Sequence, residues 1–126
     1  MLSQTKMVIK ARKVLEKLYD GTCDIIEHKK IRNEHGQTVF KEEIVLQNVP
    51  CRLAYKNLIN GTQDNGVAAK TEQITVLIVN PDVVIPSGSK LVVSQNKRIT
   101  AYSQSGEPAV YNTHQEVMLK LFEGWS

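Results

Sequence analysis

The chain has 126 residues, of which 41% are hydrophobic and 23% are charged. This length and composition are typical of one globular domain, residues 1–126, and exclude two full domains, a disordered chain and a collagen-like chain. The formal net charge is +3, and residues 1–20 carry all of it because the remaining residues are neutral overall. No apolar run approaches the roughly 20 residues of a membrane-spanning helix, and the N-terminal segment lacks a signal-peptide pattern, so we expect no membrane contact and no export.

Residues 1–20 show the spacing of an amphipathic helix. Apolar residues such as Met7, Ala11 and Val14 recur at steps of three and four, which places them on one helix face. We expect Gly21 to end this helix with a positive φ angle. The basic residues of the segment fall mostly off the apolar face and could meet nucleic acid, an anionic membrane or an acidic protein, although a solvated helix face is the more common reason for such a pattern. These residues are Lys6, Lys10, Arg12, Lys13 and Lys17.

After Gly21 the pattern changes to short runs rich in Val, Ile and Thr, separated by Gly, Pro and Asn. A tight hairpin turn is expected at residues 33–36 and another at Asn96-Lys97. The pattern predicts a mainly β protein, a small β-barrel of about six to eight strands with one N-terminal amphipathic α-helix. The expected strands are 22–32, 38–48, 51–57, 72–79, 90–95, 98–103 and 114–122.

Alternation along the strands identifies a candidate core. Cys51, Leu53 and Tyr55 share one strand face and are expected to point inward. The strand 72–79 is apolar on both faces, so we expect both to be covered, the second by the N-terminal helix or by a neighbouring subunit. Two cysteines, Cys23 and Cys51, are too few for a disulfide scaffold and are expected to be free core thiols in a reducing compartment.

Residues 57–71 break the strand pattern and predict a long mobile loop. The segment is polar, contains glycine and has no useful apolar period. Long loops in small domains are either functional or merely disordered, and composition leaves both open. The candidate functional residues of this loop are Asn60, Gly61, Gln63, Asp64, Asn65, Gly66 and Lys70.

The sequence offers little for catalysis or metal binding. The histidines and cysteines lack the spacing of a metal site, and no phosphate-binding or dinucleotide motif is present, so we expect no enzyme activity, metal or cofactor. His114 and Glu116 share a strand face and could bond each other, with Gln115 on the opposite face. A hydrolase built on that pair is retained as a third hypothesis beside an ordinary polar strand edge. The aromatic residues are scattered along the sequence, which disfavours a base-stacking barrel surface.

Several short segments, taken in order, resemble the small head-completion proteins of tailed bacteriophages, in particular the XkdH/YqbH-like group of PBSX-type prophages. The similarity runs from about the Cys23 strand to the His114 strand, and the order and spacing of the segments make it specific. The segments are Pro50-Cys51-Arg52-Leu53, Val79-Asn80-Pro81-Asp82-Val83-Val84-Ile85-Pro86-Ser87-Gly88-Ser89-Lys90, Tyr102-Ser103-Gln104-Ser105-Gly106-Glu107-Pro108 and Tyr111-Asn112-Thr113-His114-Gln115-Glu116-Val117.

The resemblance implies a structural head-closure or stopper protein. Such a protein would be made in the bacterial cytoplasm and would form a ring at the neck of the phage particle, between portal or adaptor and tail-completion proteins. It would retain the packaged double-stranded DNA, with the loop at 60–70 projecting into the channel, and a monomer in isolation would be compatible with that role. The alternative function is a nucleic-acid-binding barrel that uses the basic helix. For the 106–108 turn and the 114–116 strand the resemblance implies barrel closure or ring contacts. The motif positions are Pro50, Cys51, Arg52, Gly88, Gly106, Pro108, His114, Gln115 and Glu116.

Overall fold

A computed structural model describes residues 2–60 and 70–125, with side chains described for 5–57 and 72–125. Within these residues the structure is mainly β with one N-terminal helix, as predicted. No helix among them is long and apolar enough to cross a membrane. In chain order the elements are α1 (Leu2–Glu16), β1 (Gly21–Arg32), β2 (Thr38–Asn60), β3 (Lys70–Val79), β4 (Lys90–Gln95), β5 (Arg98–Gln104), β6 (Ala109–Val110) and β7 (Gln115–Leu121).

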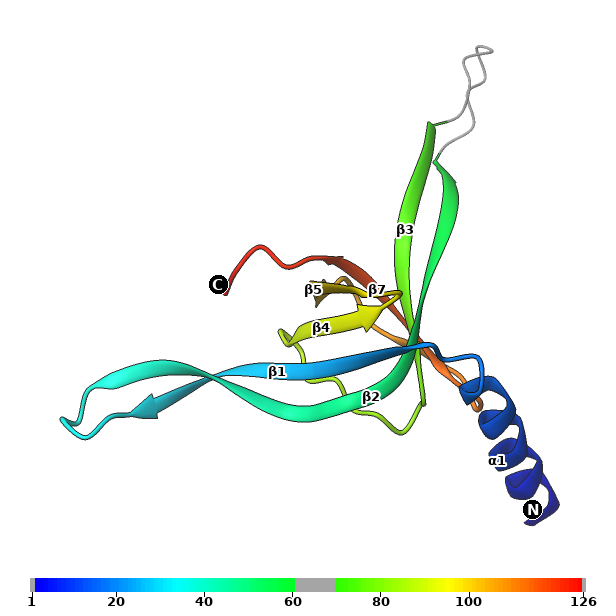
Figure 1. The fold of residues 1–126 in the computed structure, drawn as a ribbon, viewed down its shortest axis with the longest axis horizontal. Helices are drawn as coiled ribbons and strands as arrows, with labels where there is room; N and C mark the ends of the chain where they lie inside the picture. The colour runs from blue at the N-terminus through cyan, green and yellow to red at the C-terminus, as the bar shows by residue number, and fades with distance from the viewer. Residues whose placement is uncertain (1, 61–69, 126) are drawn as a thin grey trace.

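The strands form one antiparallel sheet that closes on itself (Figure 1). The strand order is β3-β2-β1-β4-β5-β7-β6, and β3 also pairs with β7, so the ladder returns to its start. Within the closed part of the sheet, this pairing removes the open edges that would otherwise invite pairing with other chains. The two predicted tight turns are confirmed: Asn33 accepts the Gly36 N–H at 3.0 Å, and Asn96 and Lys97 both adopt positive φ angles between β4 and β5.

Strand β2 corrects the predicted break between strands 38–48 and 51–57. It is continuous over 23 residues, and Pro50 lies within it, opposite Thr22. The register shifts at Asp24, where the positive-φ Asn48 donates its backbone N–H to the Asp24 carboxylate at 2.9 Å. This bulge bends the strand without ending it, because the extra residues are absorbed locally while pairing continues on both sides.

The length of β2 gives the molecule two projecting arms (Figure 1). Its first half pairs with β1 and its second half with β3, and each hairpin extends beyond the closed sheet. The second arm corrects the predicted loop at 57–71, because residues 57–60 and 70–71 are paired strand, with Asn60 opposite Lys70. Of the candidate loop residues, Gly61, Gln63, Asp64, Asn65 and Gly66 lie outside the described residues.

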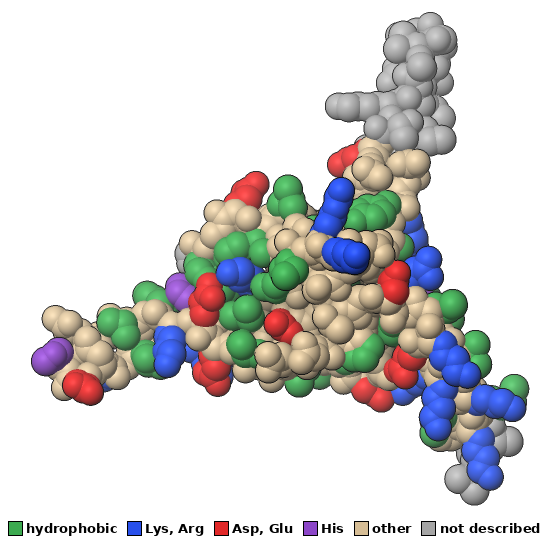
Figure 2. Space-filling model, viewed as in Figure 1, with side chains coloured by type: hydrophobic (Ala, Val, Ile, Leu, Met, Phe, Trp, Pro, Cys, Tyr) green, Lys and Arg blue, Asp and Glu red, His purple; other side chains and the backbone are tan. Residues whose placement is uncertain are grey.

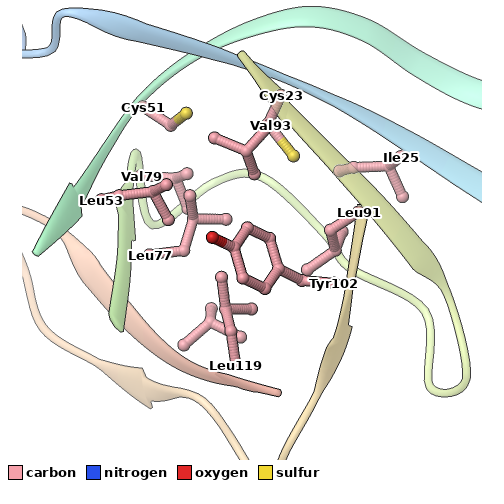
Figure 3. Packing of buried hydrophobic residues seen from close by; sticks show 11 residues of the cluster. Cys23, Ile25, Cys51, Leu53, Leu77, Val79, Leu91, Val93, Tyr102 and Leu119 are labelled. Atoms are coloured by element: carbon pink, nitrogen blue, oxygen red, sulfur yellow. The ribbon is translucent and has the colours of Figure 1, made fainter. Parts of the chain in front are cut away.

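The core fills the interior of the closed sheet (Figure 3). Cys23, Cys51 and Leu53 are buried there as predicted, and both cysteines are free. Tyr55 was predicted to be inside but is 59% exposed, because it lies at the open end of the sheet beside Arg98 and Thr100. The core cluster is Cys23, Ile25, Cys51, Leu53, Leu77, Val79, Leu91, Val93, Tyr102, Val117 and Leu119.

Helix α1 does not cover β3, contrary to expectation, and instead projects from the body (Figure 1). It ends at Glu16 rather than near residue 20, and Gly21 is the first residue of β1 without a positive φ angle. Met7 is 70% exposed and Val14 is 57% exposed, so part of the predicted apolar face has no cover within the described chain. The outer face of β3 is nevertheless buried at Val76, whose side chain is 3% exposed.

Candidate interaction surfaces

Four of the five predicted basic residues form one exposed row along α1 and the turn that directly follows it. Lys6, Lys10, Lys13 and Lys17 are spaced by four, three and four residues and are all exposed. At 3.6 residues per turn this spacing keeps the three on the helix within an arc of about 60°. Figure 2 shows the Lys and Arg side chains gathered over this helix. We call these four residues the lysine stripe.

Arg12 belongs to a different face of the helix and ties it to the body. Its guanidinium donates to the Asp82 carboxylate at 2.8 Å and to the Asn112 carbonyl at 2.8 Å. One turn further along, the Asn80 amide donates to the Glu16 carboxylate at 2.8 Å. These polar contacts fix the orientation of α1 and leave the lysine stripe facing away from the body.

An apolar groove lies at the base of α1. Its volume is about 530 Å³, and it runs between the helix end, the bulged part of β2 and the turn after β3. Its floor is made by Leu46, Val49, Pro50, Val83 and Val84. Its remaining lining residues are Glu16, Asn80 and Asp82, so it carries two carboxylates and no base.

Gln115 holds the floor of this groove in place. The side chain is 3% exposed, and its amide donates to the carbonyls of Asn80 at 3.0 Å and Val83 at 2.7 Å. A buried amide whose hydrogens are both used fixes a turn that has no strand ladder of its own. The predicted motif positions Pro50 and Gln115 are therefore brought together here, one in the groove and one beneath it.

His114 and Glu116 bond each other, as the shared strand face predicts, at 3.0 Å between Nε2 and Oε2. Lys56 donates to the other oxygen of Glu116 at 2.9 Å, and the Tyr111 ring stacks on His114. Hydrogen bonds from His114 and then Lys56 lower the pKa of Glu116 below its ordinary value. A carboxylate already held by two partners is suited to fixing β7 against β2 rather than to accepting a proton.

Four aromatic side chains that are distant in sequence form a cluster under the first arm. The His28 ring is stacked between Phe40 and Trp125, and Phe122 meets Trp125 edge to face. The Trp125 indole donates to Glu42 at 3.0 Å, which with Lys90 lowers the pKa of that carboxyl. These aromatic residues, scattered along the sequence, are therefore brought together by the fold. The predicted hairpin between β1 and β2 could have placed His28 near Phe40, because the register puts His28 opposite Glu42, two residues from Phe40.

The other predicted motif residues have structural positions. Burial raises the pKa of Cys51 to about 12, as it does for Cys23, so neither thiol is reactive at neutral pH. Gly88 and Gly106 adopt positive φ angles in turns, which explains the need for glycine there. The turns at Gly88 and Gly106, the exposed Arg52, and the group formed by His114, Glu116 and Lys56 lie in different places. The structure does not bring these motif positions together into one site. No metal-binding group of His, Cys, Asp and Glu occurs in the described part of the chain.

Comparisons with known proteins find similarity to this chain among solved structures. No family model matches the sequence, and no curated protein matches it. Among solved structures, the chain is similar to the phage-like element PBSX protein xkdH from Bacillus subtilis, with a TM-score of 0.48 and 16% sequence identity. The match covers 81% of this chain and 93% of the neighbour.

Proposed function

We propose that this chain is a structural subunit of a phage particle that assembles into a ring at the head-tail junction, where it retains packaged DNA and docks the tail. The observation that carries the proposal is the amount of apolar surface on elements that project from the body. Met7 and Val14 on α1, Leu18 in the turn after it, and Phe40 and Ile44 on β2 are each more than half exposed. Projecting elements with such surface are typical of proteins that complete their packing against other subunits.

The order of sequence motifs supports the particular place in the particle. The segments that resemble head-completion proteins include Pro50, the turn with Asn80 and Asp82, and Gln115. In the structure these residues build or support the apolar groove rather than a pocket with reactive groups. This placement favours a role in assembly, and we propose no enzymatic step.

The proposal is tested with particles from cells that make the protein and from cells deleted for it. We expect the deletion to give separate heads and tails in negative-stain microscopy, with heads that lose their DNA. A plasmid copy of the wild-type gene should restore joined particles, and a label on the protein should lie at the neck. Normal joined particles from the deletion strain would overturn the proposal.

The lysine stripe supports a second candidate, a nucleic-acid-binding protein. Its four exposed cations could neutralise duplex phosphates, and such binding would weaken with salt in proportion to the phosphates contacted. A DNA affinity that falls steeply with salt, and falls further in Lys10→Glu and Lys13→Glu, would favour this candidate. Arg12→Ala is not suitable for the test because Arg12 also ties α1 to the body.

A further inference from the structure

We infer that α1 of one copy docks in the apolar groove of the next copy, a head-to-tail contact that repeats around the assembly. The inference rests on the proposed function, since it names the partner through which the ring forms. Both halves of the contact are on the described part of this chain. One is the exposed side of α1, and the other is the groove floored by Leu46, Val49, Pro50, Val83 and Val84.

The helix side combines positive charge with apolar surface. Met7 and Val14 are 70% and 57% exposed, and their spacing of seven residues places them on one side of α1 beside the lysine stripe. Leu18, in the turn that follows the helix, is 56% exposed. DNA would use the lysines and leave this apolar surface in water. A protein groove with an apolar floor and acidic walls would cover both, which favours a protein partner.

The groove side has the complementary character. Val84 is 73% exposed and Leu46 is 39% exposed, so apolar side chains meet solvent there. Two carboxylates line the walls with no base among the lining residues, and the Asp82 side chain remains 77% exposed although Arg12 contacts it. A positive helix against a negative groove steers the encounter and fixes its orientation.

One copy cannot make this contact with itself. Arg12 and Glu16 hold α1 to the body by polar contacts, and they orient the lysine stripe away from it. Two different surfaces of the same chain that complement each other give a heterologous interface, which forms a ring when the rotation between copies closes. The groove also accounts for the exposed apolar face of α1, which the first arm and the closed sheet leave uncovered.

The contact is tested by cross-linking between single-cysteine variants. V14C places a thiol on the helix side, V84C places one on the groove side, and both positions are more than half exposed. The native thiols of Cys23 and Cys51 are buried with pKa values raised to about 12, so a short bismaleimide should react with the new thiols alone. Mixing the two variants should give a covalent dimer, whereas a mixture of V14C with I99C should not. Ile99 is 74% exposed and does not line the groove.

A charge exchange tests the pairing in function. V84K places a cation among the groove residues and should repel the lysine stripe, lowering the number of joined particles by about tenfold or more. Combining V84K with K10E and K13E should restore joined particles. I99K is the matched control, because it adds the same charge at an equally exposed β5 position and should leave assembly unchanged.

The outcomes separate this inference from the proposed function. No V14C to V84C cross-link, either in concentrated protein or in isolated particles, would overturn the inference, as would normal assembly by V84K. If the deletion separates heads from tails while V84K complements it fully, the proposed function stands and the interface is elsewhere. If K10E and K13E abolish salt-sensitive DNA binding while V84K assembles normally, the lysine stripe serves nucleic acid instead.

Discussion

At the scale of single residues, Gln115 shows how one buried amide supports a surface. Replacing Gln115 with Leu removes both of its donated hydrogen bonds, to the Asn80 carbonyl and to the Val83 carbonyl; the Asn80 carbonyl keeps only the Val83 N–H. We expect a loss of about 2–3 kcal/mol in the free energy of unfolding, measured by urea denaturation. Gln73→Leu, at an exposed strand position, should change it by less than about 0.5 kcal/mol. Equal losses in the two variants would contradict the role assigned to Gln115.

Glu116 gives the protein a pH-dependent contribution to stability. Its pKa is lower in the folded state than in the unfolded chain, first through the His114 hydrogen bond and then through Lys56. Folding therefore favours the carboxylate, and this contribution is present above the ordinary pKa near 4.5 and is lost as the pH falls through the folded value. The pair with Lys56 is partly exposed, which limits its energy.

We expect Glu116→Gln to lower the free energy of unfolding by roughly 0.5–1 kcal/mol at pH 7, after allowance for solvent screening. The difference from the wild-type protein should shrink as the pH falls below the ordinary pKa near 4.5, and it should be lost once the pH passes below the lower folded pKa, where the wild-type carboxyl is protonated too. Denaturation curves at a series of pH values measure it. Glu34→Gln, at the exposed hairpin tip, should follow the wild-type protein throughout. A Glu116→Gln curve that stays parallel to wild type down to pH 3 would contradict this account.

At the scale of elements, the first arm depends on the C-terminal residues. An isolated two-stranded ribbon is marginally stable in water. Here Trp125 stacks on His28 of β1 and donates to Glu42 of β2, which joins both strands of the arm to the body. The arm is therefore held by a contact from the far end of the sequence.

Trp125→Ala should release the arm while the closed sheet stays folded. We expect amide hydrogen exchange over residues 28–42 to accelerate by up to about tenfold, since an aromatic pair contributes roughly 0.5–1.5 kcal/mol. Exchange in β4 and β5 should remain unchanged. Tyr111→Ala removes a stacked aromatic elsewhere and should not affect the arm. Uniform acceleration in both variants would mean that the arm is not a separate opening unit.

The elements were predictable where local chemistry decides them. The turn at Asn33 and the Asn96-Lys97 turn follow from residues that tolerate positive φ, and the core cysteines follow from strand alternation. The predicted break between strands 38–48 and 51–57 does not occur, because a bulge stabilised by Asp24 keeps β2 continuous through Pro50. That compensation comes from another strand and has no local signal.

At the scale of the whole molecule, the surfaces could not be predicted from the sequence. The groove combines Glu16, Pro50 and Val84 from three separate segments, and the pairing of β2 with β3, with Cys51 opposite Val79, places Pro50 beside the turn that carries Val84. The apolar pattern of α1 was visible, but whether its own body or another copy covers it depends on tertiary contacts. The Arg12 pair with Asp82, 70 residues away, decides this by fixing the orientation of the helix.

Association through this helix would make the thermal stability of the protein depend on its concentration. A partner that binds only the folded state stabilises it by RT ln(1 + [L]/Kd), about 2.7 kcal/mol when the concentration is one hundred times Kd. We therefore expect the Tm to rise by about 5 °C or more between dilute and concentrated protein at low salt. Differential scanning fluorimetry and calorimetry together cover that concentration range.

Salt should weaken this concentration dependence and substitution should remove it if charge and apolar burial act together. At about 1 M salt the Debye length falls to roughly 3 Å, so attraction between the lysine stripe and the acidic groove is screened while apolar burial is not. The concentration dependence should therefore weaken at high salt without vanishing, whereas V84K should abolish it and I99K should preserve it. A dependence that V84K leaves intact would mean that the copies associate through another surface, such as the arm that carries Phe40 and Ile44.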